Sequence, residues 1–203
     1  AKFNTDKQTI LDPKVFFFFF DGCIMEGVTA ECSSFAGHLK IDNLIAIYDA
    51  NHVTLDGPLA ESCSEDVKMR YRSYGWDVFE VDGHNLEAID LCIREVRETQ
   101  DKPCLIIAHT VIGKGSPNKA GTHYAHGAPL GLEEIAATKK LLGIPEEPFY
   151  IPQAVIDFFK KKLEGDVKKE GEWQKTFDFW AKENPDLFAE FENYKKRTTK
   201  ERI

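Results

Sequence analysis

Four short apolar runs recur along the first half of the chain, and stretches with helical spacing lie between them. Apart from Glu80 in the third run, apolar residues fill these runs without a break, which is typical of strands that are buried on both faces of a sheet. The predicted strands are Val15–Phe20, Leu44–Tyr48, Val78–Val81 and Cys104–Ala108. Alternation of such strands with helices predicts an α/β fold, in which helices flank a parallel sheet.

The stretches between the predicted strands, and the chain after residue 131, have the spacing of amphipathic helices. In the first part the predicted helices are residues 25–40 and 64–74, with a third that begins after Asn85, a suitable N-cap residue. In the C-terminal part they are residues 132–142, 153–163 and about 172–194. We therefore expect an α/β region over residues 1–131 and a helical C-terminal extension of the same domain over residues 132–203.

Charge and hydropathy narrow the classes of partner. Lys and Arg number 26 against 34 for Asp and Glu, which gives a net charge of −8. A protein that binds a phosphate backbone needs a basic stripe, so nucleic acid is not an expected partner. No apolar run approaches the roughly 18 residues of a membrane helix, so a membrane is not expected either. A cofactor or a small metabolite is the expected kind of ligand.

The five cysteines favour a reducing compartment. Their number is odd, and no two of them have the two-residue gap of a zinc knuckle or a redox site. The apolar run Val15–Phe20 is too short for a signal peptide and is followed at once by Asp21. We expect reduced thiols in a cytoplasmic protein.

Polar side chains stand where the first two predicted strands end. Asp21 and Gly22 follow the first strand, and Asn51 follows the second, about one strand–helix–strand unit later. Ligands of parallel α/β sheets bind beyond the carboxyl ends of strands, and a carboxylate and a carboxamide offer the oxygen atoms that Mg²⁺ prefers. A metal ion that is shared with a bound phosphate is one interpretation. Ordinary strand-end turns are the other, because Asp-Gly and Asn are frequent in turns.

A loop without periodicity precedes the C-terminal helices. Residues 110–131 contain several glycines and prolines together with His123 and His126. Loops of this length inside a compact domain are uncommon and often functional. The loop is therefore a candidate part of the site, with His123 interpreted as a loop residue that has no role of its own.

Several motifs closely resemble sequences of the transketolase family. They are Asp21–Gly27, Asn43–Asn51 and Gly121–Leu130, with shorter matches at Gly113–Ser116 and Tyr74–Trp76, and they extend the resemblance over nearly the whole chain. The spacing from Asp21 to Asn51 is shared by many thiamine-diphosphate enzymes. The His-Gly-Ala-Pro-Leu element that begins at His126 points to transketolase and its relative dihydroxyacetone synthase. The resemblance implies the thiamine-diphosphate-binding fold, here part of the domain that binds the diphosphate and the metal.

The resemblance also implies a role for each residue of the metal and diphosphate site. Asp21, the side chain of Asn51 and the backbone carbonyl of Val53 would hold Mg²⁺, or Ca²⁺, against the diphosphate of thiamine diphosphate. The backbone of Gly22 would contact that diphosphate, and Leu55 would pack near the thiazolium ring. The expected cofactors are therefore thiamine diphosphate and a divalent cation.

Three residues match positions with catalytic roles in the family. His126 would lie near the diphosphate and the reacting carbon, where it would help to bind and polarise the substrate. Glu26 and Glu31 resemble the glutamates that link the two cofactor sites across the transketolase dimer. For both glutamates a structural role is the alternative, since the helix dipole favours acids in the first turns of a helix.

The activity that the resemblance implies is transfer of a two-carbon ketol unit from a ketose phosphate to an aldose phosphate. Sugar phosphates are then the expected substrates, and the expected protein partner is a second copy in a homodimer or a complementary pyrimidine-binding chain. One alternative is another thiamine-diphosphate carboligase, such as dihydroxyacetone synthase or deoxyxylulose-phosphate synthase, although the motif at His126 disfavours the latter. Another alternative is an inert subunit that keeps the fold for assembly.

The chain departs from the family pattern in two ways. Phe20 stands where the family has glycine, and Phe16–Phe19 stand where it has mixed aliphatic residues. In a close-packed layer, overpacking of this kind costs about 1–3 kcal/mol per site, and a side chain at position 20 would oppose close approach of the diphosphate. The chain is also shorter than the family at both ends and lacks the activating glutamate of the pyrimidine-binding domain, so no turnover is expected from it alone.

Overall fold

The computed structural model describes the backbone of residues 2–200 and the side chains of residues 2–196. The chain divides into two compact units. One unit is Lys14–Pro148, and the other combines the residues up to Pro13 with those from Phe149 onward. Each unit has a hydrophobic core of its own.

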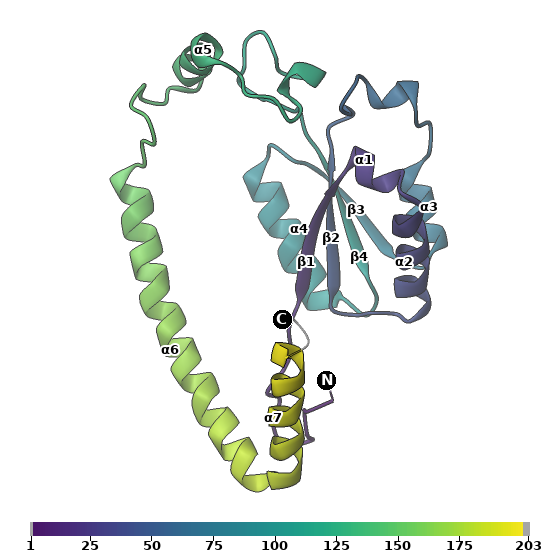
Figure 1. Cartoon of the computed structure of the whole chain (residues 1–203), viewed down its shortest axis with the longest axis vertical. Coiled ribbons are helices and arrows are strands. Elements are labelled where there is room, and N and C mark those ends of the chain that lie inside the picture. Colours follow the sequence, from purple (N-terminus) through teal and green to yellow (C-terminus); the bar gives the residue numbers. More distant parts are fainter. Residues whose placement is uncertain (1, 201–203) are drawn as a thin grey trace. The chain divides into compact units, whose positions relative to one another are not determined.

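A four-stranded parallel sheet forms the centre of the first unit (Figure 1). Its strands are β1 (Val15–Phe20), β2 (Leu44–Ala50), β3 (Asp77–Asp82) and β4 (Cys104–His109). They lie in the order β1-β2-β4-β3, and every neighbouring pair is parallel. The predicted fold class is confirmed, and all four predicted strands are present.

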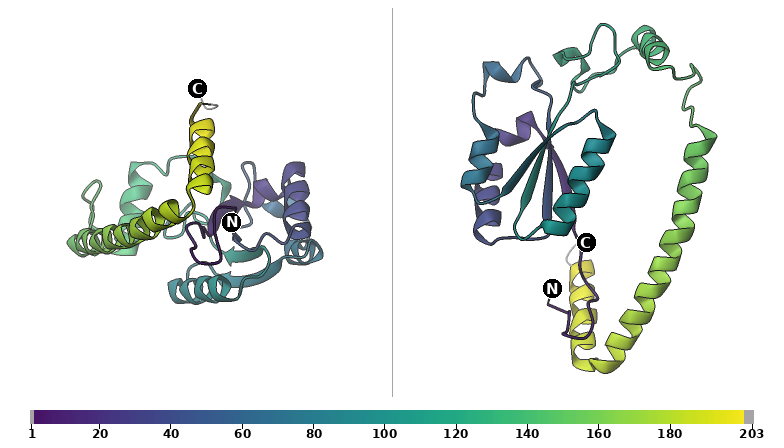
Figure 2. Two further views of the ribbon diagram at one scale, coloured as in Figure 1. Left: turned by 90° about the horizontal axis from the view of Figure 1, so that it is seen from below. Right: turned by 180° about the vertical axis from the view of Figure 1, so that it is seen from behind.

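Helices cover both faces of this sheet, as the two opposite views in Figures 1 and 2 show. One face carries α2 (Gly27–His38) and α3 (Val67–Ser73), and the other carries α4 (Leu86–Thr99). The predicted N-cap of α4 is confirmed, because the Asn85 side chain accepts a hydrogen bond from the Ala88 N–H at 3.0 Å. The predicted helix at 25–40 is in fact α2, preceded by a separate four-residue turn, α1 (Asp21–Ile24).

Strand β1 lies at an edge of the sheet, and the prediction that it is buried on both faces is wrong. Of its five phenylalanines only Phe19 is buried, and it packs against Tyr48 and Tyr71 with ring centroids 5.4 and 6.2 Å away. The others, Phe16, Phe17, Phe18 and Phe20, are between 36% and 67% exposed. These four rings, which we call the phenylalanine strip, are not overpacked within the first unit, because no other layer of Lys14–Pro148 covers them. Strand β3, at the other edge, is half-buried and also departs from the predicted full burial.

Replacing Phe18 by lysine is expected to reduce self-association of the chain. Phe18 is 67% exposed on an edge strand, and apolar edge strands pair readily with other chains, whereas lysine at an edge opposes pairing. Sedimentation velocity over a concentration series should show fewer oligomers for Phe18→Lys than for the wild type. The contrasting variant is Phe19→Lys, at the buried position next to Phe18. It buries a charge and should therefore unfold the first unit, as circular dichroism would show. Equal association of Phe18→Lys and wild type would contradict a role for the strip.

Two long loops lie beyond the carboxyl ends of the strands (Figure 1). The loop after β2 contains a short 3₁₀ turn, η1 (Leu59–Glu61), and the loop after β4 contains another, η2 (His123–Ala125). The second loop leads into α5 (Leu132–Leu142), whose bounds are those predicted from the sequence. The sheet thus presents both loops at the edge where ligands of α/β proteins bind.

The second unit consists of the N-terminal segment packed on two helices, α6 (Gln153–Glu183) and α7 (Pro185–Lys200). Trp180 is fully buried and packs with Phe3 and Ile10. The predicted helices at 153–163 and about 172–194 are wrong in their division, because α6 continues through 164–171 and the break falls at Asn184. Pro185 explains that position, since proline disfavours helical geometry in the preceding residue but is tolerated in the first turn of a helix. Among the described residues no helix is both long and apolar enough to cross a membrane.

Candidate functional site

The carboxyl ends of β1 and β2 meet, and they bring Asp21 to the loop that follows β2. Phe20 pairs with Asp49 in the register of the two strands, and Asp21, the next residue, is 1% exposed. Its Oδ2 accepts a hydrogen bond from the His52 N–H at 2.8 Å, and its Oδ1 accepts one from the Tyr48 hydroxyl. Burial, helped by the neighbouring Asp21, raises the pKa of Tyr48, so its hydroxyl remains a donor to the carboxylate.

Hydrogen bonds also orient Asn51 and Val53. The Asn51 Nδ2 donates to Oδ2 of Asp49 at 3.3 Å, and the Asn51 Oδ1 accepts from the Val53 N–H at 3.0 Å. Val53 is buried and forms an isolated antiparallel bridge with Pro58. The side-chain amide therefore has a defined orientation at the end of β2, one residue before the His52 that contacts Asp21.

The donor atoms at these strand ends fit a hard divalent cation. A carboxylate, a side-chain amide and a backbone carbonyl all offer oxygen, and the oxygens of Asp21 and Asn51 that accept hydrogen bonds each have a second lone pair. No group of three or more His, Cys, Asp or Glu among the described residues could hold a metal. Mg²⁺ prefers octahedral coordination by oxygen, so an ion at Asp21 and Asn51 would need further oxygen ligands, and a diphosphate supplies such oxygens.

Four of the predicted residues line one cavity. Gly22, Glu26, Leu55 and His126 border a space of about 620 Å³ between α1, the loop after β2 and the loop after β4. An added Cβ at Gly22 would have nothing within 4 Å, so the backbone there faces open space. The Nδ1 atom of His126 is buried and has no hydrogen-bond partner among the described residues. The cavity thus combines an approachable backbone at Gly22, the exposed side chain of Leu55 and the ring of His126.

A neighbouring cavity of about 500 Å³ is lined by Asp21, Tyr48 and His52. Pro58 lines both cavities, so they adjoin each other. Phe20 lines neither of them. Its φ of −127° and ψ of 174° are an extended conformation that any residue adopts, so this position does not require glycine. The phenylalanine ring therefore leaves the Gly22 side of the turn open.

The two predicted glutamates are placed differently. Glu26 occupies the N-cap position of α2 without a side-chain capping bond, and it lines the 620 Å³ cavity. Glu31 is exposed in the second turn of α2 and lines neither that cavity nor its neighbour. The structure thus brings Glu26, but not Glu31, to the residues of the candidate site.

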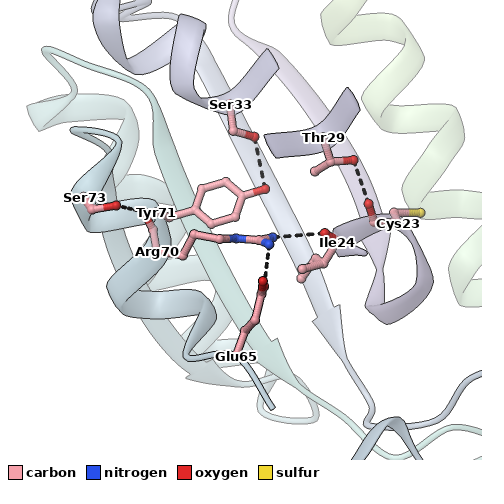
Figure 3. A network of polar contacts seen from close by, with 8 residues as sticks. All are labelled: Cys23, Ile24, Thr29, Ser33, Glu65, Arg70, Tyr71 and Ser73. Atoms are coloured by element: carbon pink, nitrogen blue, oxygen red, sulfur yellow. Dashed lines mark hydrogen bonds and ion pairs between the residues drawn. The ribbon is translucent and has the colours of Figure 1, made fainter. Parts of the chain in front are cut away.

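Arg70, which the sequence placed only in the predicted helix at 64–74, supports the turn that carries Asp21 and Gly22. From α3 its guanidinium donates to the Ile24 carbonyl at the end of α1, at 3.2 Å, and pairs with Glu65 (Figure 3). The Thr29 hydroxyl in α2 donates to the carbonyl of Cys23 at 2.6 Å. Helices α2 and α3 therefore both fix α1. No spacing or motif in the sequence indicates this, because the contact joins residues 46 positions apart.

The sequence of the chain matches one protein family. Residues 1–199 match the thiamine diphosphate binding domain of transketolase. Curated relatives include the transketolase of Nostoc sp., 44% identical over 196 residues, and transketolase 1 of Escherichia coli, 43% identical over 192 residues. These alignments cover 96% and 94% of this chain but 29% of each relative, so the chain spans less than a third of their length.

Solved structures agree with the sequence comparison. A transketolase of Pichia stipitis in complex with sedoheptulose 7-phosphate matches 93% of this chain and 28% of its own, with a TM-score of 0.88 and 38% identity. The transketolase of Leishmania mexicana matches 94% of this chain and 29% of its own, with a TM-score of 0.89 and 33% identity. The resemblance inferred from the motifs is confirmed. By sequence and by fold, this chain belongs to the transketolase family, within its thiamine diphosphate binding domain.

Proposed function

We propose that this chain supplies the metal- and diphosphate-binding part of a thiamine-diphosphate-dependent transketolase. The observation that carries the proposal is the shared cavity of Gly22, Glu26, Leu55 and His126, to which α1 and two separate loops contribute. Family membership shows only that the chain is related to transketolases. The position of these four residues around one cavity supports the further inference that the chain still binds the cofactor. Since the chain spans less than a third of its relatives, the transfer reaction would be a property of the complete assembly.

Asp21, Asn51 and the Val53 carbonyl would hold Mg²⁺, or Ca²⁺, at the ends of β1 and β2. The buried carboxylate of Asp21 would supply the negative charge, and its hydrogen bonds from Tyr48 and His52 would hold it in one orientation. An acidic chain, with a net charge of −8, repels a free diphosphate, and a divalent cation offsets that repulsion. The ion would therefore anchor the cofactor rather than polarise the substrate.

The residues of the 620 Å³ cavity would position cofactor and substrate. Thiamine diphosphate, when bound, supplies the carbanion chemistry by which a two-carbon ketol unit passes from a ketose phosphate to an aldose phosphate. The Gly22 N–H would donate to a diphosphate oxygen, and the exposed Leu55 would offer an apolar contact to the cofactor ring. His126 would contact the diphosphate or the substrate through its ring, since this residue borders the cavity. The bound sugar phosphate of the Pichia stipitis enzyme supports this class of substrate.

A second polypeptide surface would complete the site. A pyrimidine-binding domain, in a homodimer or in a complementary chain, would supply the glutamate that activates the cofactor. Glu26 at the cavity would face that partner, and Glu31 would act with it across the interface. All five cysteines are free, which supports a reducing compartment such as the cytoplasm as the location.

Calorimetric titration of the purified chain with thiamine diphosphate tests this function. The titration is run with and without Mg²⁺, and with and without a pyrimidine-binding transketolase domain. We expect binding that requires Mg²⁺ and strengthens when the partner is present, with no ketol transfer by the chain alone. Absence of binding under all four conditions would indicate a subunit that keeps the fold without the cofactor site. Ketol transfer by the chain alone would refute the need for a partner.

A further inference from the structure

A buried carboxylate joins the start of α5 to the loop that follows β4. Glu134, in the first turn of α5, is buried at 9% exposure. Its Oε1 accepts hydrogen bonds from the Ser116 hydroxyl and, at 2.8 Å, from the Asn118 N–H, while its Oε2 accepts from the Asn118 Nδ2 at 2.9 Å. Three donors on two nearby residues thus converge on one carboxylate. Ser116, Asn118 and Glu134 form what we call the Glu134 clamp.

The clamp closes the ends of the segment that carries His126. Residues 119–131, which lie between Asn118 and the start of α5, are the His126 loop. The two ends of this loop are also joined by a bond from the Lys119 Nζ to the Leu130 carbonyl at 2.9 Å. The Ser116 hydroxyl accepts from the Lys119 N–H at 3.2 Å and so continues the clamp into the loop. A loop with fixed ends has fewer conformations, and less entropy is lost when it holds a side chain in one place.

The other end of α5 packs on the same segment. An added Cβ at Gly115 would lie 2.8 Å from the Leu142 side chain, so only glycine allows this contact, and its φ of +91° also favours glycine. Within the loop, Ala125 packs closely on Gly113, where an added Cβ would come 2.8 Å from the Ala125 Cβ. The helix, the segment 113–118 and the residue before His126 are therefore one packed body.

We propose that Glu134 is a positioning residue, which clamps the His126 loop and thereby holds His126 in the cavity that it shares with Gly22 and Leu55. The inference rests on the proposed function for the importance of that cavity. The clamp itself stands on contacts that need no cofactor. Glu134 lines neither the 620 Å³ cavity nor its neighbour, so it acts through His126 and not on a ligand directly.

The charge state of Glu134 suits this role. Hydrogen bonds from Ser116 and Asn118, with the nearby Lys119, hold the pKa of Glu134 at about 2, below the ordinary value of 4.5. The carboxylate is therefore charged at neutral pH and accepts all three bonds. Because the folded pKa lies below the unfolded one, the contribution of the clamp is complete above pH 4.5 and is lost as the pH falls toward 2.

Glu134→Gln tests the clamp, with Glu133→Gln as the matched control. Glutamine at position 134 keeps the shape of the side chain but places an N–H₂ group opposite one of the groups that donate to Glu134. Glu133 is the exposed neighbour in the same turn, and its substitution removes the same charge. In Glu134→Gln we expect amide hydrogen exchange in residues 119–131 to accelerate about tenfold. We also expect the ring NMR signals of His126 to move while those of the exposed His38 stay in place. Glu133→Gln should match the wild type in both measurements.

A purely structural role would give a different result. Lower thermal stability with unchanged His126 signals and unchanged exchange in the loop would overturn the proposal. If Glu134→Gln fails to fold, Ser116→Ala removes one of the three donors to Glu134, together with the acceptor of the Lys119 N–H, and should give the same local changes at smaller size. These readouts need no cofactor. Failure of thiamine diphosphate to bind would therefore overturn the proposed function and leave the proposed role of Glu134 unaffected. Unchanged His126 signals in Glu134→Gln would overturn the role of Glu134 and leave the proposed function unaffected.

Discussion

Replacing Gly37 by alanine is expected to disrupt the packing of α2 against the turn after α3. An added Cβ at Gly37 would lie 1.8 Å from the carbonyl oxygen of Tyr74 and 3.3 Å from the Trp76 ring. The obstacle is backbone, which cannot rotate away as a flexible side chain does. Trp76 is held in place by its own bond, from the indole N–H to the Ser33 carbonyl at 2.8 Å. We expect a loss in the upper part of the ~1–3 kcal/mol range for overpacking, or beyond it.

Gly27→Ala is the matched control, because Gly27 begins the same helix and an added Cβ there would meet nothing within 4 Å. Alanine at this position should change the free energy of unfolding by less than about 1 kcal/mol and in the stabilising direction. Urea denaturation followed by circular dichroism measures both variants. Similar losses for Gly37→Ala and Gly27→Ala would show that the Tyr74 carbonyl is not the obstacle and that the packing argument fails.

The apolar runs predicted the strands but not their order in the sheet. Continuous burial is real in Cys104–Ala108, which lies in the central strand β4, where helices cover both faces. The run Val15–Phe20 has the same pattern and is an edge strand. Hydropathy reports that a segment is apolar, whereas the neighbours that cover it come from other parts of the chain. A run of phenylalanines therefore has the same hydropathy pattern in a covered strand and in an exposed one.

Part of the geometry of the candidate site was predictable from the sequence. Asp21 follows a strand, and parallel strands end at the same edge, so its approach to the loop after β2 follows from topology. The family motif, and not spacing, indicated Leu55 and His126. The residues that hold the site in place were not predicted, because Arg70 contacts Ile24 and Glu134 contacts Ser116 only after the chain has folded. Residues that position a site leave little local signal, since each contact depends on the whole packing of the unit.

Asp21→Asn is expected to weaken Mg²⁺-dependent binding of thiamine diphosphate at least about 100-fold. The substitution keeps the size of a side chain that is 1% exposed, but it removes the only charge that the proposed ligand set offers the ion. Loss of a residue that merely orients a metal ligand already costs roughly 10–100-fold in affinity, so a direct ligand should cost at least as much. The amide oxygen of the substituted side chain can still accept from the His52 N–H or the Tyr48 hydroxyl, so the fold should persist.

Asp42→Asn is the matched control for this change. Asp42 is exposed at the opposite end of β2, so its substitution removes the same charge from the chain without touching the strand ends that meet at Asp21. Both variants are titrated with thiamine diphosphate in the presence of Mg²⁺ and the pyrimidine-binding partner, with circular dichroism to establish folding. The control should bind as the wild type does. Wild-type affinity in a folded Asp21→Asn protein would exclude Asp21 as a metal ligand and would shift the anchoring of the diphosphate to the Gly22 backbone and His126.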